Sequence, residues 1–231
     1  MGLRMKAAAG MLAVIMLIIL CQILSLKLEK RIDNYNRVKE TFKISGDALI
    51  ILDAGHGGLD SGKIGINDQE EKDINLKIAL KIKKLLEEQG ISVMMTRSAD
   101  ERLSETQTED LKARTEIMNR SNAALAVSIH QNSFRDSSVS GAQVFYYPDS
   151  DEGRKAADAI QEELNDMQPD NRKEVKANDT YYILKNTEIP VVIVECGFLS
   201  NYTEAEKLAD DSYQSVVAGT VVRGILQYIN D

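Results

Sequence analysis

The sequence predicts an α/β fold: a single mixed, mostly parallel sheet of about six strands with helices on both faces, preceded by one N-terminal transmembrane helix. Three observations lead to this prediction. From residue 47 onward, apolar runs of strand length alternate with segments of helical period, a pattern typical of helices packed on both faces of one sheet. The first run, residues 48–53, is nearly continuous in Leu and Ile, as in strands covered on both faces. An uncharged stretch, residues 7–26, precedes all of these elements.

The uncharged stretch is long enough to cross the ~30 Å hydrocarbon core of a bilayer as a helix. It exceeds the usual apolar region of a signal peptide, and no small-residue cleavage site follows it. An uncleaved anchor is therefore favoured over a cleaved signal, which is the alternative. We expect an anchor over residues 1–26, a charged spacer over residues 27–46 and one globular domain over residues 47–231. We place that domain outside the cytoplasm, held at the membrane by the anchor.

Composition narrows the possible partners and the means of stabilisation. The formal net charge of −8 argues against a nucleic-acid partner, because phosphate binding needs a basic face. One of the two cysteines, Cys21, lies in the predicted anchor and the other, Cys196, lies in the domain. A disulfide between them is implausible, so the domain has to be stable through its hydrophobic core alone.

The first half of the domain alternates strand and helix. After the strand at residues 48–53, residues 71–89 place Ile74, Ile78 and Ile82 on one face with lysines opposite, and Gly90 follows. This pattern predicts an amphipathic helix with a glycine at its C-terminal end. Residues 91–96 (Ile-Ser-Val-Met-Met-Thr) form the next apolar run and predict a strand. A polar stretch then leads to a helix expected near residues 109–121.

The second half continues the alternation. Residues 124–129 and 142–147 are apolar runs of strand length, and Pro148 ends the second. Residues 152–167 carry an apolar stripe and predict a helix. Short strands are expected at residues 181–184 and 191–195, on either side of Pro190. A helix over residues 211–229 ends the chain.

Only two histidines occur in the chain, and each lies where an apolar run ends. His56 lies in the glycine-rich segment Asp-Ala-Gly-His-Gly-Gly, and His130 lies in Ser-Ile-His-Gln-Asn. Imidazole is the commonest metal ligand, and sites in open α/β sheets lie beyond the carboxyl ends of the strands. The two histidines together therefore predict a metal site, whereas either alone would be read as a turn histidine bonded to backbone.

A catalytic zinc site needs a third protein ligand and an open position for water. A carboxylate at the start of the helix at residues 71–89 is well placed, because negative charge is favoured at a helix N-terminus. Spacing alone does not separate Glu70 from Glu71. The full set of candidates for the third ligand is Asp60, Asp68, Glu70, Glu71, Asp73 and Cys196.

Glu195 is the candidate general base. It ends the apolar run 191–194, and a carboxyl group at a buried strand end has a raised pKa that suits proton transfer. The alternative is a structural carboxylate bonded to backbone N–H groups. The next residue, Cys196, could suggest a cysteine nucleophile with His130 as its base. Strand alternation places Cys196 on the opposite face from Glu195, so we expect a buried, unreactive thiol.

These residues, in this order, resemble the zinc-dependent N-acetylmuramoyl-L-alanine amidases of bacterial cell walls. The resemblance runs from Ile50 to the C-terminus, in four blocks at residues 53–58, 71–76, 128–133 and 195–201. The block Glu-Lys-Asp-Ile-Asn-Leu fixes the register and selects Glu71. The resemblance implies that His56, Glu71 and His130 bind one Zn²⁺ and that Glu195 is the catalytic carboxylate.

The resemblance further implies hydrolysis of the amide bond between N-acetylmuramic acid and L-alanine in peptidoglycan. We also expect Asn132, in the same block as His130, to contact the substrate. The anchor and the segment at residues 141–147 look most like the branch that endospore formers use on spore cortex. The alternative is a non-catalytic peptidoglycan-binding or scaffold protein with the same fold, which would lack a ligand or the base. A regulatory protein partner is compatible with the sequence, which does not identify one.

Overall fold

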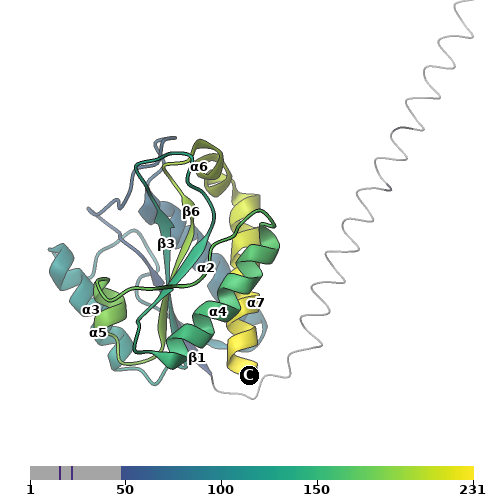
Figure 1. The fold of residues 1–231 in the computed structure, drawn as a ribbon. Helices are drawn as coiled ribbons and strands as arrows, with labels where there is room; N and C mark the ends of the chain where they lie inside the picture. Colours follow the sequence, from purple (N-terminus) through teal and green to yellow (C-terminus); the bar gives the residue numbers. More distant parts are fainter. Residues whose placement is uncertain (1–15, 17–21, 23–47) are drawn as a thin grey trace, which may run out of the picture. The chain divides into compact units, whose positions relative to one another are not determined.

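The computed structural model describes Met16, Gln22 and residues 48–231 (Figure 1). The predicted anchor and spacer therefore lie almost wholly outside the described residues, and both stay predictions. Within the described part of the chain, no helix has the length and apolar character needed to cross a membrane. Residues 48–231 fall within one compact unit.

The described residues form one six-stranded sheet, with the strand order β2-β1-β3-β6-β4-β5. All neighbouring strands are parallel except β4, which runs antiparallel to β6. This arrangement confirms the predicted mixed, mostly parallel sheet. The strands are β1 (Leu49–Ala54), β2 (Ser92–Met95), β3 (Leu125–Asn132), β4 (Gln143–Tyr146), β5 (Lys176–Ala177) and β6 (Val191–Phe198).

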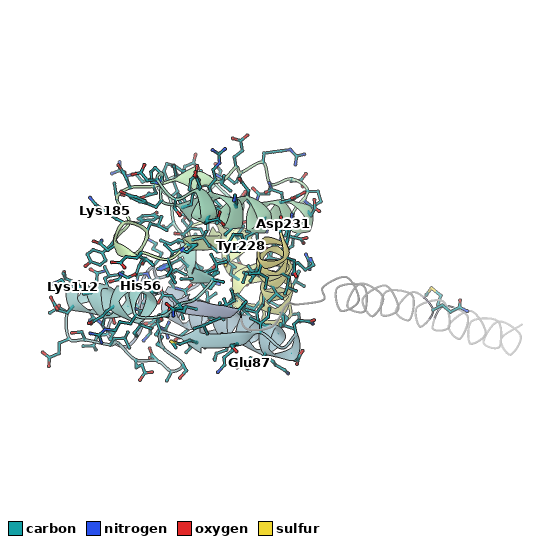
Figure 2. All side chains as sticks on the ribbon, turned by 90° about the horizontal axis from the view of Figure 1, so that it is seen from below. His56, Glu87, Lys112, Lys185, Tyr228 and Asp231 are labelled. Carbon is teal, nitrogen blue, oxygen red and sulfur yellow. The ribbon has the colours of Figure 1, made fainter. Side chains whose placement is uncertain are left out.

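Helices cover both faces of the sheet, as predicted. Helices α3 and α5 lie on one face of the sheet, and α7 packs with α2 and α4 on the other face (Figure 1). Figure 2 shows the same division, with Lys112 and Lys185 on one side of the molecule and Tyr228 on the other. The helices are α2 (Glu71–Glu88), α3 (Gln107–Asn119), α4 (Asp151–Met167), α5 (Tyr182–Asn186), α6 (Tyr202–Ala209) and α7 (Asp211–Asn230).

One predicted strand is wrong. Residues 181–184 do not extend the sheet but begin helix α5. The Asn178 side chain accepts hydrogen bonds from the backbone N–H groups of Thr180 and Tyr181, and such a turn starts a helix rather than a strand. The adjacent apolar residues Ile183 and Leu184 are both buried, a pattern that short helices and strands share. The strand that completes the six-stranded sheet is instead β5, at Lys176–Ala177. Helix α6 was not predicted.

The core on the α3 and α5 face shows how the sheet is held below the site. Met118 of α3 and Leu184 of α5 pack against Ile51, Ala126 and Ile193 of the three central parallel strands. These side chains are almost fully buried, so the central strands have little freedom to shift. The carboxyl ends of the parallel strands β1, β3 and β6 lie side by side at one end of the sheet, and the predicted site residues lie there.

Candidate metal centre and active site

His56 lies in a tight turn that directly follows β1. Its φ angle is 63°, in the left-handed region that non-glycine residues seldom adopt. Gly55, before it, lies directly against the His130 ring: a Cβ atom at this position would overlap the imidazole. The glycine is therefore required by the close approach of the β1 turn to His130 of β3.

The structure brings His56, Glu71 and His130 together. Glu71 Oε1 lies 3.3 Å from His56 Nε2 and 2.9 Å from His130 Nδ1. One ligand atom from each residue lies within 4.8 Å of the other two, and no other such group of three occurs among the described residues. Two imidazoles and one carboxylate match the donor set of catalytic zinc sites. The cluster therefore fits a zinc ion.

Glu71 is held by bonds other than those to the histidines. Its Oε2 accepts a hydrogen bond from the backbone N–H of Lys63 at 2.8 Å. Its Oε1 accepts further bonds from the backbone N–H of Gln131 and from the Asn75 side chain. Burial raises the pKa of Glu71, but the hydrogen bonds and charges of the two histidines outweigh it and hold the pKa well below its usual range. Glu71 is therefore a fixed carboxylate.

Asp60 orients the His56 ring through the ring nitrogen that does not face Glu71. Asp60 Oδ2 lies 3.1 Å from His56 Nδ1, which leaves Nε2 turned toward Glu71. Burial lowers the pKa of His56, but Glu71 and Asp60 together raise it to about 9. A carboxylate that fixes the orientation of a ligating histidine is a regular feature of metal sites. Asp60, one of the candidate third ligands, thus has a supporting position instead.

Two buried arginines hold the backbone of the His56 turn. Arg114 of α3 donates to the carbonyl oxygens of Ala54 and His56, at 2.8 and 2.7 Å. Arg97 donates to the carbonyl oxygens of Ala54 and Gly55, at 2.8 and 3.0 Å. Three consecutive carbonyls are therefore bound by guanidinium groups, which counteract the strain of the left-handed turn.

Asp53 balances the charge of Arg114 beneath this turn. Its Oδ1 accepts from Arg114 at 2.8 Å and from Thr96 at 2.6 Å, and its Oδ2 accepts from Ser128 at 2.6 Å. Burial raises the pKa of Asp53, but Arg114 and the two hydroxyl donors outweigh it and lower the pKa to about 2. Asp53 is thus a buried, ionised side chain with its lone pairs satisfied.

Glu195 lies on β6 directly beside His130 of β3. Its Oε2 is buried without a hydrogen-bond partner, in contrast to the carboxylates of Glu71 and Asp53. Burial raises the pKa of Glu195 to about 7; the charge of His130 opposes this shift and that of Glu71 adds to it. A buried carboxyl group with an unused oxygen beside a metal centre has the properties of a proton-transfer group.

The remaining candidates for the third ligand lie outside the cluster. Glu70 pairs with Lys72 at 3.2 Å, and Asp68 and Asp73 are exposed. Cys196 is fully buried, and burial raises the pKa of its thiol to about 12. A thiol of this kind is protonated at neutral pH and is a poor nucleophile, so the cysteine-nucleophile alternative is not supported.

Asn132 lies at the end of β3, two residues after His130. Its Oδ1 accepts a hydrogen bond from the backbone N–H of Ser133, and its carbonyl accepts one from Leu199. The second of these bonds joins the end of β3 to the residue that follows β6. The predicted contact between Asn132 and substrate stays a prediction.

Sequence reasoning did not identify Arg114 and Asn75 as supporting residues. Arg114 lies in a helix of mixed polar sequence, and nothing in its spacing distinguishes it from an exposed arginine. Asn75 Nδ2 donates to the Gly55 carbonyl and to Glu71. Its position four residues after Glu71 on the same helix face was a usable signal.

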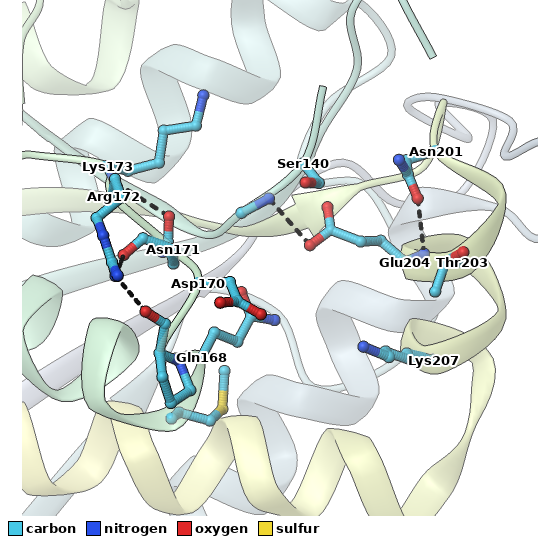
Figure 3. Close-up of a pocket in the computed structure, with 13 residues that line it drawn as sticks. Ser140, Gln168, Asp170, Asn171, Arg172, Lys173, Asn201, Thr203, Glu204 and Lys207 are labelled. Atoms are coloured by element: carbon cyan, nitrogen blue, oxygen red, sulfur yellow. Dashed lines mark hydrogen bonds between the residues drawn. The ribbon is translucent and has the colours of Figure 1, made fainter. Parts of the chain in front are cut away.

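A separate cavity of about 780 Å³ lies between the loop before β4, the segment after α4 and the start of α6 (Figure 3). None of the predicted site residues lines it. The Glu204 side chain accepts hydrogen bonds there from the backbone N–H groups of Gly141 and Phe198. The carboxylate thus links the loop before β4 to the end of β6, and we assign it a structural role.

Comparison with known proteins agrees with this geometry. Residues 50–227 match the family of N-acetylmuramoyl-L-alanine amidases. The germination-specific N-acetylmuramoyl-L-alanine amidase of Bacillus subtilis is 38% identical over 191 residues, covering 79% of this chain and 80% of that protein.

Solved structures show the same similarity. The CwlD amidase from Clostridioides difficile, solved in complex with the GerS lipoprotein, superposes with a TM-score of 0.77 at 42% identity, covering 80% of this chain and 99% of that one. The catalytic domain of CwlV, an N-acetylmuramoyl-L-alanine amidase from Bacillus (Paenibacillus) polymyxa, gives a TM-score of 0.72 at 30% identity, with coverage of 80% and 99%. The resemblance seen in the sequence is confirmed: the chain belongs to the N-acetylmuramoyl-L-alanine amidase family and is an enzyme that hydrolyses the amide bond between muramic acid and L-alanine in peptidoglycan.

Proposed function

We propose that this amidase is a zinc hydrolase in which His56, Glu71 and His130 hold one zinc ion and Glu195 is the catalytic carboxylate. The proposal rests on one observation: a cluster of metal-binding side chains lies beside a buried carboxyl group. A cluster of three donor atoms within 4.8 Å lies beside Glu195, whose Oε2 is buried and has no hydrogen-bond partner. The alternative of a non-catalytic scaffold would lack one of these four residues, and all four are in place.

A bound zinc ion supplies Lewis-acid chemistry, which polarises an amide carbonyl and lowers the pKa of water to about 7. Glu195 accepts a proton from the water that attacks the carbonyl carbon. It then returns the proton to the nitrogen of L-alanine as the C–N bond breaks, which leaves a free amine on L-alanine and a carboxylic acid on the lactyl group. A pKa of about 7 suits both transfers, because the carboxyl group exchanges its proton readily near neutral pH.

The test is metal analysis combined with mass analysis of the products. Purified protein should contain about one zinc per chain. It should release free stem peptides from purified peptidoglycan, and a chelator should abolish the release. His56→Ala and His130→Ala should each lower zinc content and activity together. Full zinc and full activity in either variant would contradict the proposed ligand set.

We further propose that the enzyme acts at the cell envelope, in the remodelling of spore peptidoglycan, held at the membrane by residues 1–26. The germination-specific relative supports the spore role. The relative solved with a lipoprotein supports a regulatory protein partner outside the cytoplasm. Fractionation of cells that produce the full chain tests the location. A mature N-terminus between residues 26 and 45 would instead identify a cleaved signal.

A further inference from the structure

A second pocket adjoins the metal centre. It has a volume of about 490 Å³ and is lined by Lys63, Ser133, Phe134 and Arg135. The backbone N–H of Lys63 donates to Glu71 at 2.8 Å, so one wall of the pocket is connected directly to the proposed zinc ligand. The other lining residues, 133–135, directly follow β3, the strand that carries His130. The pocket is therefore within reach of a substrate held at the metal centre.

The lining of this pocket is cationic and aromatic, although the chain as a whole carries a net charge of −8. Two of its four lining residues are positively charged and none is acidic. The nearest carboxylate along the chain, Asp136, is not among the lining residues, and its Oδ1 is bonded to the backbone and hydroxyl of Ser138. The pocket thus has a local charge opposite to that of the molecule.

Phe134 adds an apolar surface to the pocket. Its side chain is 58% exposed, so the ring is accessible to a ligand. Its backbone is fixed, because the N–H of Phe134 donates to the Ser200 hydroxyl at 3.0 Å. An exposed ring on an anchored loop is a favourable contact surface for a ligand, because little conformational entropy is lost on binding.

The two sides of the scissile bond differ in charge. The glycan on the acyl side is built of uncharged sugars, whereas the stem peptide on the amine side carries free carboxylates beyond L-alanine. We propose that this pocket binds the acidic stem peptide: Lys63 and Arg135 interact with its carboxylates, and Phe134 packs against its aliphatic part. This inference rests on the proposed function, and it orients the substrate with its peptide toward the loops at residues 63 and 133–135.

The experiment uses the full chain with Lys63→Glu, Arg135→Glu and the double variant. Lys84→Glu is the matched control for the single variants, because Lys84 is exposed on α2, does not line the pocket and undergoes the same charge change as each of them. Each protein is assayed on two muropeptides that differ only in whether the stem carboxylates are free or amidated. Binding of the dipeptide L-Ala–γ-D-Glu and of its amidated form is measured separately by calorimetry.

For the double variant we expect KM on the acidic muropeptide to rise about 10-fold or more, with kcat within about 3-fold of wild type. KM on the amidated muropeptide should change by less than about 2-fold, and the control should change neither. Dipeptide binding should weaken in parallel, and zinc content should be unchanged. An equal loss on both muropeptides, or no loss on the acidic one, would overturn the proposal. If wild type cleaved neither muropeptide, the proposed function would fail, and the dipeptide titration would still decide the pocket.

Discussion

Replacement of Gly55 by alanine tests the geometry of the metal centre most directly. The added Cβ would lie 2.7 Å from His130 Nδ1 and still closer to Cε1 and Nε2 of the same ring. Ordinary Cβ contacts begin near 3.4 Å, so the imidazole has to retreat by about 1 Å. Its backbone lies in a central strand between β1 and β6, so the ring itself has to rotate, and this rotation disturbs its 2.9 Å contact with Glu71.

The size of the effect follows from this displacement. A shift of about 1 Å in a catalytic group costs on the order of 10²-fold in rate. Loss of correct ligand orientation costs about 10- to 100-fold in metal affinity. We therefore expect Gly55→Ala to lower kcat/KM about 100-fold or more and to weaken zinc binding at least about 10-fold.

The assay pairs kcat/KM on a muropeptide with zinc affinity measured by competition against a chelator. Gly219→Ala is the control, because a Cβ at Gly219 of α7 meets no atom within 4 Å. That variant should match wild type in both measurements and gain up to about 1 kcal/mol in stability from the higher helix propensity of alanine. If Gly55→Ala kept wild-type zinc affinity and turnover, the close approach of the turn to His130 would not govern the site.

Three further predictions follow from the same geometry. Glu195→Gln should lower activity by about 10²-fold or more while zinc content is kept; loss of zinc would instead make Glu195 a ligand. Cys196→Ser should leave turnover within several-fold of wild type, because the thiol is buried and protonated; inactivation by a thiol reagent with substrate protection would contradict this. The pKa of Asp53 is about 2 in the folded protein, against an ordinary value of 3.8. Above pH 4 its ionised form therefore stabilises the folded state by about 2 kcal/mol. This contribution is lost as the pH falls toward 2. Urea unfolding of wild type and Asp53→Asn should therefore show a stability difference that narrows over that pH range; a constant difference would refute the assigned ion pair.

The sequence allowed the central sheet and its helices to be predicted because their signals are local. Buried parallel strands such as β1 and β6 appear as continuous apolar runs, and α2 and α4 repeat their apolar residues at helical spacing. The error at residues 181–184 has the same origin. Four residues give too short a window to separate periods of 2 and 3.6, and the deciding contact is the Asn178 side chain, outside the apolar run.

For the site, sequence reasoning identified the residues whose chemistry is conspicuous. Two histidines at strand ends predicted a metal centre, and the structure brings both beside Glu71. The choice between Glu70 and Glu71 needed the family register, because adjacent residues at a helix start are equally favoured by its dipole. The fold separates them: Glu71 turns inward to the histidines, and Glu70 pairs with Lys72 near the surface.

The network around Arg114 shows what could not be predicted. The left-handed His56 turn costs of the order of 1–3 kcal/mol and would relax if its carbonyls were free. Arg97 and Arg114 donate to the carbonyls of three successive residues in this turn, and each bond to a charged donor contributes about 1.5–3 kcal/mol. The arginines can lie under the turn only because Asp53 is buried there as well. Each of the three residues is costly to bury alone, and Arg114 lies outside every sequence block that resembles the family, so its own sequence context does not identify it. The network becomes favourable only when the fold brings the three residues together.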